Sequence, residues 1–181
     1  FSFKRRMAII IRPITSDEAA LYVELRLEML QESPRAFGAS VETDAASDLE
    51  GMRARLESQG ENRTFGAFDS DTGELLGSVG VARQGPHQKR AHALGVWGMY
   101  VAPRGRGRGI GRELMQALID YSESLPGVCV ISLSVSAATP VAQALYASLG
   151  FVEWGREPRS LQIDGEYYTE IFMQLQLEPL E

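Results

Sequence analysis

Apolar residues along this chain follow two patterns, short runs with the period of a strand and longer stripes with the period of a helix. One stretch repeats the helical spacing i, i+3, i+4, i+7 with Ala142, Leu145, Tyr146 and Leu149. Residues 128–135 form a continuous run rich in β-branched residues, which predicts a strand buried on both faces. The predicted strands cover residues 8–14, 63–68, 74–83, 93–101, 128–135, 151–163 and 166–177. Four helices are predicted. The first begins at a cap at residue 15 or 16 and ends near 33, and the second covers 48–58. The third runs from the end of a glycine-rich segment to about 124, and the fourth covers 139–149.

The order of these elements predicts the fold class. Strands and helices alternate in a way that indicates an α+β fold, with a mixed sheet and helices on both of its faces. Asp164-Gly165 between the last two strands is a strong signal for a two-residue hairpin loop. We interpret residues 7–181 as a single domain. Residues 1–6, which precede Met7, are interpreted as an extension or tag remnant and take no part in the fold prediction.

Composition narrows the classes of function. The formal net charge of −6 argues against nucleic acid as a partner, so any affinity for phosphate must come from a local patch. No run of about 18 apolar residues exists, which argues against a membrane-spanning segment. The single cysteine, Cys129, cannot form an intrachain disulfide and fits a cytoplasmic protein.

A glycine- and arginine-rich segment separates the strand at 93–101 from the helix that follows it. Glycines stand at 105, 107, 109 and 111, and arginines stand at 104, 106, 108 and 112. Glycine lets an anion approach the backbone closely because no Cβ intervenes. The free N–H groups at a helix N-terminus also attract anions. The segment therefore predicts a clamp for a diphosphate.

Other motifs that bind phosphate or nucleic acid fit this segment poorly. A dinucleotide fingerprint, G-x-G-x-x-G, fails at its sixth position whichever glycine starts it. A P-loop needs G-x-x-x-x-G-K-[ST], and the segment contains no lysine. An arginine-glycine RNA-binding tract is normally disordered and has no helix directly after it. A solvated basic turn without a ligand stays as the plain alternative.

Residues 106–111 match the motif R/Q-x-x-G-x-G/A, and in this motif the chain resembles the GNAT superfamily of acetyl-CoA-dependent N-acetyltransferases, bacterial type. Trp97–Val101 resembles the strand before the motif in that family, and Leu145–Phe151 resembles a later junction between helix and strand. Residues 157–161 with 164–168 resemble the closing hairpin of many bacterial members. The resemblance covers roughly residues 8–177. It implies a mainly antiparallel sheet of about seven strands with about four helices, in which two central parallel strands splay apart.

The resemblance also implies how acetyl-CoA binds as a co-substrate, without a metal. Its pantetheine arm would lie in the gap between the splayed strands and pair with the backbone of residues 99–101 like an added strand. Its pyrophosphate would lie on the N–H groups of residues 106–111, with charge from the arginines. The implied cofactor-binding residues are Met99, Tyr100, Val101, Arg106, Gly107, Arg108, Gly109, Ile110, Gly111, Arg112 and Thr139.

Two of the candidate residues lie in the segment 139–149. Tyr146 matches the tyrosine that serves as general acid in many family members, and a phenol with a pKa of about 10 can donate a proton to a leaving thiolate. The alternative is a tyrosine that packs on the apolar face of its helix. Many members have asparagine at the position of Thr139. Here Thr139 is interpreted first as the N-cap of its helix, with Pro140 at the first helical position.

The base that accepts a proton from the attacking amine is left open. No Asp or Glu occurs in residues 91–101, where several family members place one. His92, Glu42, Asp44 and an ordered water are all candidates.

The acceptor itself is left open as a primary amine of a small molecule or a peptide. Loops 34–46 and 84–90, together with Tyr167 and Tyr168, are expected to line its pocket, and Trp154 is expected in the core or the pocket. The leading hypothesis is an N-acetyltransferase that acts by direct attack in a ternary complex. The alternative is a non-catalytic module that senses acyl-CoA. The oligomeric state stays open, a homodimer included.

Overall fold

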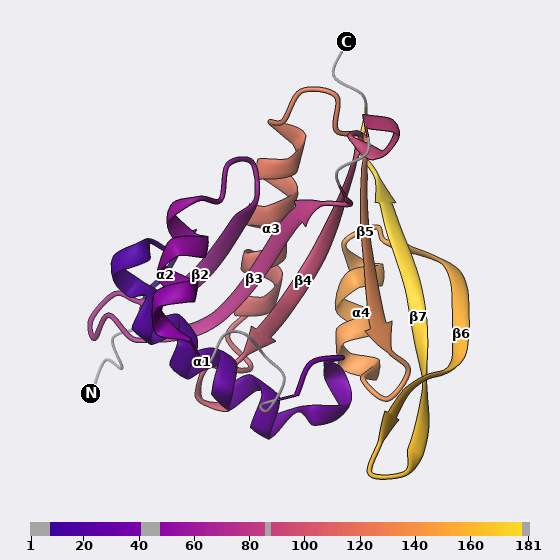
Figure 1. The fold of residues 1–181 in the computed structure, drawn as a ribbon, viewed down its shortest axis with the longest axis horizontal. Helices are drawn as coiled ribbons and strands as arrows, with labels where there is room; N and C mark the ends of the chain where they lie inside the picture. The colour runs from indigo at the N-terminus through magenta and orange to yellow at the C-terminus, as the bar shows by residue number, and fades with distance from the viewer. Residues whose placement is uncertain (1–7, 41–47, 86–87, 179–181) are drawn as a thin grey trace, which may run out of the picture.

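The computed structural model describes residues 8–40, 48–85 and 88–178 (Figure 1). Residues 1–6, interpreted above as an extension, and the candidate bases Glu42 and Asp44 lie outside the described residues. The strands are β1 Ile9–Pro13, β2 Arg63–Asp69, β3 Leu75–Arg83, β4 Ala93–Val101, β5 Val130–Ser136, β6 Val152–Ile163 and β7 Glu166–Gln176. The helices are α1 Ala19–Glu32, α2 Leu49–Glu57, α3 Ile110–Glu123 and α4 Pro140–Ser148. Short 3-10 turns include η2 Pro34–Ala36, η4 Gln88–Arg90 and η5 Pro103–Gly105.

The described strands form one seven-stranded sheet in the order β1-β2-β3-β4-β5-β7-β6. Neighbouring strands are antiparallel except for the parallel pair of β4 and β5 at the centre. α1 and α2 cover one face of the sheet, and α3 and α4 cover the other (Figure 1). The prediction of a mixed, mainly antiparallel sheet with about four flanking helices is confirmed.

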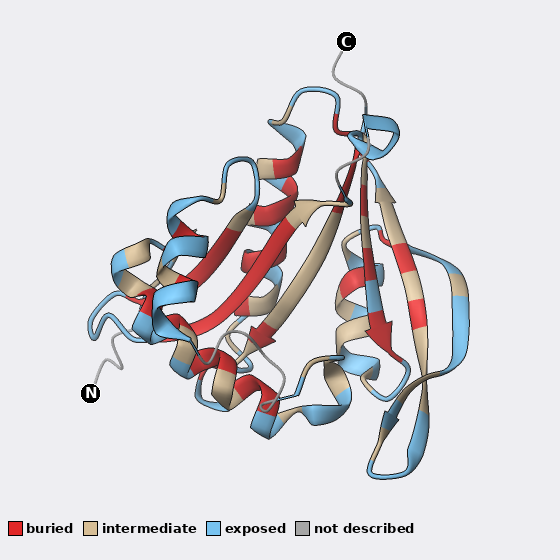
Figure 2. Cartoon of the chain, in the orientation of Figure 1, coloured by how far each residue is buried: buried red, intermediate tan, exposed pale blue. Residues whose placement is uncertain are grey.

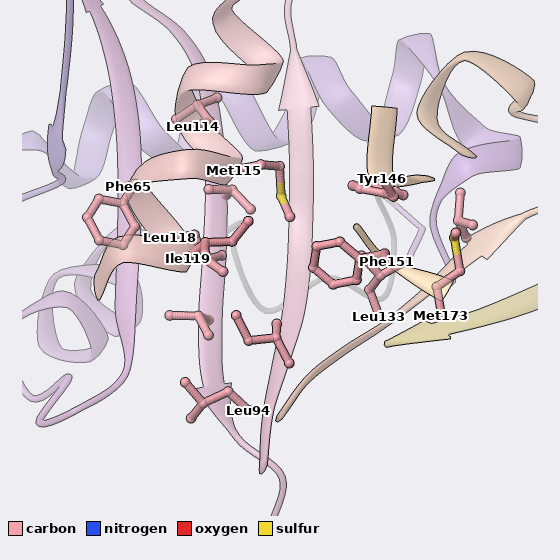
Figure 3. Close-up of a cluster of buried hydrophobic side chains, with 14 of the residues drawn as sticks. Phe65, Leu94, Leu114, Met115, Leu118, Ile119, Leu133, Tyr146, Phe151 and Met173 are labelled. Carbon is pink, nitrogen blue, oxygen red and sulfur yellow. The ribbon is translucent and has the colours of Figure 1, made fainter. Parts of the chain in front are cut away.

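Each face of the sheet has its own hydrophobic core. Behind the sheet, Leu114, Met115 and Leu118 of α3 are fully buried against apolar side chains of β2 to β5 (Figure 3). In front of it, Tyr22 and Met29 of α1 are buried in a second cluster. Buried positions gather along β2, β3 and β5 at the centre of the molecule, whereas β6 at the sheet edge is mostly exposed (Figure 2).

Local sequence signals explain where several elements begin and end. α1 ends just before Pro34, which disfavours helical backbone in the residue that precedes it. The Asp48 carboxylate caps α2 by accepting a hydrogen bond, 3.1 Å long, from the backbone N–H of Glu50. Gly150 follows α4 with φ +94°, the left-handed backbone that glycine adopts readily. Asp164 and Gly165 both have positive φ, 51° and 82°, as the predicted two-residue hairpin loop requires.

The prediction that β5 is buried on both faces is wrong. Ile131, Leu133 and Val135 are buried on the face that carries α3 and α4. Ser134 points to the other face and is exposed. The run contains serines at every second position, and this alternation marks a strand with one apolar face.

β4 and β5 separate soon after they pair. Their register contacts are limited to Ala93–Gly95 against Val130–Ser132, and the strands diverge toward their carboxyl ends (Figure 1). β4 also carries a bulge, because two residues stand opposite one residue of β3 between the pairs Ser78–Tyr100 and Gly80–Trp97. The divergence opens a gap in the middle of the sheet, and the splayed parallel pair implied by the family resemblance is confirmed.

Candidate active site

The glycine-rich turn joins β4 to α3 at the open end of this gap. Gly107 and Gly109 have φ of +73° and +80°, and a Cβ on either would meet no atom within 4 Å. α3 begins at Ile110, so the N–H groups of its first turn have no partner within the helix. Left-handed glycines followed by free helical N–H groups provide a concave, electropositive backbone surface suited to a phosphate.

A cavity of about 700 Å³ lies between this turn, the end of β4 and the start of α4. Its wall contains nearly all residues that the sequence associated with the cofactor; Arg108 is the exception. The lining residues of that set are Met99, Tyr100, Val101, Arg106, Gly107, Gly109, Ile110, Gly111, Arg112 and Thr139. The structure thus brings these residues together around one space, and their binding of the cofactor stays a prediction.

Two arginines of the turn form ion pairs with α1. The Arg106 guanidinium makes a bidentate pair with Glu32, with nitrogen–oxygen distances of 3.1 and 2.8 Å, and donates a third hydrogen bond to the Val101 carbonyl. Arg104 pairs with Glu28 at 2.7 and 2.8 Å. The hydrogen bonds from Arg106 lower the pKa of Glu32 below its usual range. These side chains therefore fasten the turn to α1.

The other two arginines have different surroundings. Arg112 donates a hydrogen bond of 2.6 Å to the hydroxyl of Ser148 at the end of α4, a neutral partner. Arg108 lies toward Asp69 at the end of β2. The pKa of Asp69 is lowered first by hydrogen bonds from the backbone of the following turn, and the charge of Arg108 contributes. Arg112 is thus the lining arginine whose charge no carboxylate of the described residues neutralises in an ion pair.

Tyr146 lies on α4 where the cavity meets the core behind the sheet. Its side chain is buried beside Phe151, with ring centroids 6.0 Å apart (Figure 3). Burial raises the pKa of Tyr146 to about 12, so the phenol stays protonated at neutral pH. The tyrosine is thus both packed, as one interpretation expects, and part of the cavity wall, as the other requires.

A smaller cavity of about 100 Å³ fills the gap between the splayed strands. Residues 96–99 of β4 and 133–135 of β5 form two of its walls, and Phe37 after η2 forms another. Met99, Thr139 and Tyr146 line both cavities. The gap between the strands and the cavity beside the glycine-rich turn therefore meet at these shared side chains.

The Trp97 side chain, which lines the small cavity, is held in place by contacts with a glycine and two arginines. A Cβ on Gly80 would come within 2.2 Å of the indole, so β3 needs glycine for Trp97 to lie across it. The guanidinium groups of Arg26 and Arg55 lie 5.7 and 4.6 Å from a Trp97 ring centroid, within the range of cation–π attraction. These contacts immobilise an aromatic wall of the small cavity.

Ser134 presents its hydroxyl on the wall that β5 contributes to the small cavity. The hydroxyl donates a hydrogen bond of 3.0 Å to Oε1 of Glu170 on β7. Ser160 of β6 donates to Oε2 of the same carboxylate. Glu170 is thus a carboxylate near the gap that the sequence analysis did not identify.

Thr139 occupies the N-cap position of α4, as predicted, but its hydroxyl makes no capping hydrogen bond. It donates instead to the Ser136 carbonyl, at 2.8 Å. Pro140 holds the first helical position, as predicted. The hydroxyl thus anchors the start of α4 to the end of β5, where both cavities meet.

The structure separates His92 from the other candidate residues. The His92 carbonyl accepts hydrogen bonds from Cys129 and Val130, which places His92 at the closed end of the β4–β5 pair. Four residues of extended strand, roughly 13 Å, separate it from Val96, where the small cavity begins. His92 is therefore not among the residues that line either cavity.

The expected walls of the acceptor pocket are correct in one part and wrong in another. Loop 34–46 contributes Ala36 and Phe37 to both cavities. The described residues of loop 84–90, which are 84–85 and 88–90, lie between β3 and β4 and line neither cavity. The Tyr168 ring lies 5.6 Å from the Arg35 guanidinium beside that wall, whereas Tyr167 is exposed.

Trp154 belongs neither to the core nor to the pocket wall. It is 62% exposed and lies against Phe172 on the surface of the sheet, with ring centroids 5.4 Å apart. The expectation that it lies in the core or the pocket is wrong, because β6 is the edge strand and none of the described helices covers that part of the sheet (Figure 1).

Nowhere in residues 8–40, 48–85 and 88–178 do three or more His, Cys, Asp or Glu side chains gather in a way that would hold a metal ion. Within the same ranges, no helix has the length and apolar character needed to cross a membrane.

Comparisons with known proteins agree with this geometry. Residues 26–151 match the model of the Acetyltransferase (GNAT) family. The chain is 35% identical over 101 residues to the N-alpha-acetyltransferase RimI of Mycobacterium tuberculosis, covering 54% of this chain and 58% of the relative. It is 33% identical over 81 residues to the L-methionine sulfoximine/L-methionine sulfone acetyltransferase of Pseudomonas aeruginosa, covering 45% and 46%. The aligned part thus spans less than two thirds of the length of these curated relatives.

A solved structure shows the same fold over nearly the whole chain. The acetyltransferase yncA from Salmonella typhimurium, solved with its cofactor acetyl-CoA, has a TM-score of 0.81 at 22% sequence identity, covering 96% of each chain. At this identity the likeness concerns the fold. Because the match to the family model covers more than half of the chain, the protein belongs to the GNAT family of acetyltransferases.

Proposed function

We propose that this protein transfers the acetyl group of acetyl-CoA to a primary amine of a small molecule or peptide, by direct attack within a ternary complex. The observation that carries the proposal is the meeting of two cavities at Tyr146. The larger one has a backbone surface suited to a diphosphate, and the smaller one lies in the gap between β4 and β5. A thioester in the first and an amine in the second would meet beside a protonated phenol.

Different residues would bind the cofactor and take part in the chemistry. The backbone of Gly107 to Arg112 would hold the pyrophosphate, and the unpaired edge of β4 would bind the amides of the pantetheine arm as an added strand would. The Tyr146 hydroxyl would donate its proton to the sulfur as the C–S bond breaks. Its raised pKa keeps that proton in place until the thiolate develops.

The acceptor amine would enter the small cavity from the face that carries α1. Phe37, Trp97 and Leu133 give the cavity apolar walls and Ser134 and Thr139 add polar ones, and its volume of about 100 Å³ limits the group next to the amine to a small one. One curated relative is named an N-alpha-acetyltransferase, and the other is named for the acetylation of L-methionine sulfoximine and L-methionine sulfone. We therefore propose a peptide N-terminus or a small amino compound as the acceptor.

Two measurements test this function in sequence. Titration calorimetry is expected to show acetyl-CoA binding, and absence of binding at millimolar acetyl-CoA would end the proposal. Thiol release is then measured with three amines: a short peptide with a free N-terminal alanine, L-methionine sulfone and spermidine. Release with at least one amine is expected. Tight binding without release from any of a broad amine panel would favour the acyl-CoA sensor, which the absence of a carboxylate on β4 first suggested.

The arginines of the turn offer a quantitative prediction. Arg112→Gln is expected to raise the Kd of acetyl-CoA about tenfold, because it removes a charge-assisted hydrogen bond to phosphate from an arginine with a neutral partner. Arg106→Gln is expected to raise it less than about threefold, because Glu32 already neutralises that guanidinium in an exposed ion pair. Calorimetry measures the Kd of acetyl-CoA for both variants. Equal increases in Kd would contradict the prediction that Arg112 contributes more to binding than Arg106.

A further inference from the structure

Among the described residues that line the gap between β4 and β5, one is a candidate acid and none is a carboxylate or a histidine. Tyr146 supplies the acid from the face of α4, and the β4 wall consists of Val96, Trp97, Gly98 and Met99. An alkyl ammonium must lose a proton before its nitrogen can attack a thioester. A side-chain base among the described residues would therefore act on the gap from another element.

Ser134 is the polar group on the β5 wall that is bonded to a carboxylate. Its hydrogen bond to Glu170 is 3.0 Å long, and the hydroxyl donates the proton. A hydroxyl that donates to a carboxylate keeps its lone pairs available to accept a second hydrogen bond. Ser134 alternates with Leu133 and Val135, which pack in the cluster that contains Tyr146, so its hydroxyl lies on the opposite face of the sheet from that cluster.

Glu170 of β7 is held in place from its two neighbouring strands, β5 and β6. It stands opposite Ser136 of β5 and Glu157 of β6 in the register of the sheet. Ser160 donates a hydrogen bond to the carboxylate oxygen that Ser134 does not contact, and its oxygen also lies 3.5 Å from a Glu157 oxygen. Each oxygen of the Glu170 carboxylate therefore accepts a hydrogen bond, and the two bonds fix its orientation.

The charged groups near Glu170 come from β6, β7 and η2. Glu157 adds a second carboxylate from β6. On β7, Tyr168 donates to Glu166 rather than to Glu170, and Arg35 of η2 lies over the Tyr168 ring. None of these groups bonds Ser134, so the link between the gap and a carboxylate runs through Ser134 to Glu170.

We propose that Ser134 and Glu170 form the proton relay that serves the acceptor amine, with Ser134 as the catalytic residue and Glu170 as the positioning residue behind it. This inference rests on the function proposed above. In this proposal Ser134 lines the gap and contacts the amine. The Glu170 carboxylate, which takes up the proton, lies on β7 and is linked to the gap by its hydrogen bond with Ser134.

The reaction would move two protons away from the amine nitrogen, one of them through the relay. The ammonium gives one proton to Oγ of Ser134 while the Ser134 hydroxyl proton passes to Oε1 of Glu170. The freed nitrogen pair forms the C–N bond to the thioester carbonyl carbon, and the C–S bond breaks as Tyr146 protonates the sulfur. The second proton of the nitrogen returns to the Tyr146 oxygen as the amide forms, and Glu170 releases its proton to solvent. The net products are the acetamide, free thiol and one proton.

The test compares Glu170→Gln and Ser134→Ala with the full chain, using the fastest of the three amines named above. At pH 7 each variant is expected to lower kcat at least tenfold, with acetyl-CoA affinity unchanged by calorimetry. Near pH 10, where much of the amine arrives already deprotonated, activity is expected to recover toward that of the unaltered protein. The double variant is expected to be no slower than either single variant, since both changes break one relay.

Matched controls exist on the same strands. Ser132→Ala changes the serine two residues earlier on the same face, at the paired part of β5, and Glu157→Gln removes the neighbouring carboxylate. Both are expected to keep kcat within about twofold at pH 7. Ser134→Ala at an exposed position should fold normally, which keeps the test valid even if Glu170→Gln is unstable.

Three outcomes would overturn the relay. The first is a Glu170→Gln or Ser134→Ala variant with kcat within twofold at pH 7, and the second is a loss equal at pH 7 and pH 10. The third is an equal loss in Ser132→Ala. Absence of turnover in the unaltered protein would instead count against the proposed function itself, while normal turnover with unaffected variants would remove the relay alone.

Discussion

Replacing Tyr146 with phenylalanine is expected to lower kcat about 100-fold or more while the Kd of acetyl-CoA stays within about twofold. The phenyl ring keeps the packing against Phe151, so the change removes little beyond the hydroxyl. The thiolate would then leave without a proton donor in a buried site, where an unneutralised charge is costly. Steady-state kinetics with calorimetry on the same preparation provides the measurement.

The pH dependence of the same group gives a second readout of this prediction. Because burial raises the pKa of Tyr146 to about 12, the protonated form is retained as pH rises and is lost only as pH passes through about that value. The activity of the unaltered protein should therefore show no fall between pH 7 and about pH 10.5 that depends on Tyr146. A descending limb near pH 9 that disappears in Tyr146→Phe, or an unchanged kcat in that variant, would contradict the role of general acid.

The fold was largely predictable because its signals are local. Amphipathic stripes, an Asp-Gly hairpin loop and a glycine-rich turn each depend on residues close in sequence, and the structure has every predicted strand and helix in the predicted order. β5 is the instructive exception. A β-branched run suggested burial on both faces, yet Ser134 is exposed.

The candidate site was predictable only where it lies on one continuous segment. The turn at 106–112 and Tyr146 belong to local motifs, and both line the same cavity. Glu170 reaches Ser134 across 36 positions in sequence, through the pairing of β5 and β7. A single sequence contains no local pattern for such a pair, so its discovery needed the register of the sheet.

The side-chain partners of the arginines in the turn could not be predicted from the sequence either. Four arginines in one turn suggest a common role in binding anions, but Arg104 and Arg106 pair with Glu28 and Glu32 on α1. These glutamates stand four residues apart on one face of a helix. Their pairing depends on how α1 crosses the sheet, which composition alone does not reveal.

Replacing two glycines of the turn is expected to weaken the binding of acetyl-CoA strongly. The double variant Gly107→Ala/Gly109→Ala is expected to raise the Kd of acetyl-CoA about 100-fold. Both positions have left-handed φ, +73° and +80°, which costs a residue with a Cβ about 1–2 kcal/mol each unless the backbone shifts. A shifted backbone would turn the N–H groups away from the phosphates, and two added methyl groups would occupy the surface they approach. Calorimetry with acetyl-CoA measures the loss.

Gly73→Ala/Gly127→Ala is the matched control for backbone strain. Gly73 in the β2–β3 turn and Gly127 after α3 both have φ of +73°, and a Cβ at either also meets no atom within 4 Å. Neither residue lines the two cavities. The control should therefore lose about as much stability in a denaturant melt as the Gly107/Gly109 variant, and keep the Kd of acetyl-CoA within about twofold. If the two double variants bind acetyl-CoA equally well, the glycine-rich turn does not hold the pyrophosphate, because strain alone would then account for everything the glycines contribute.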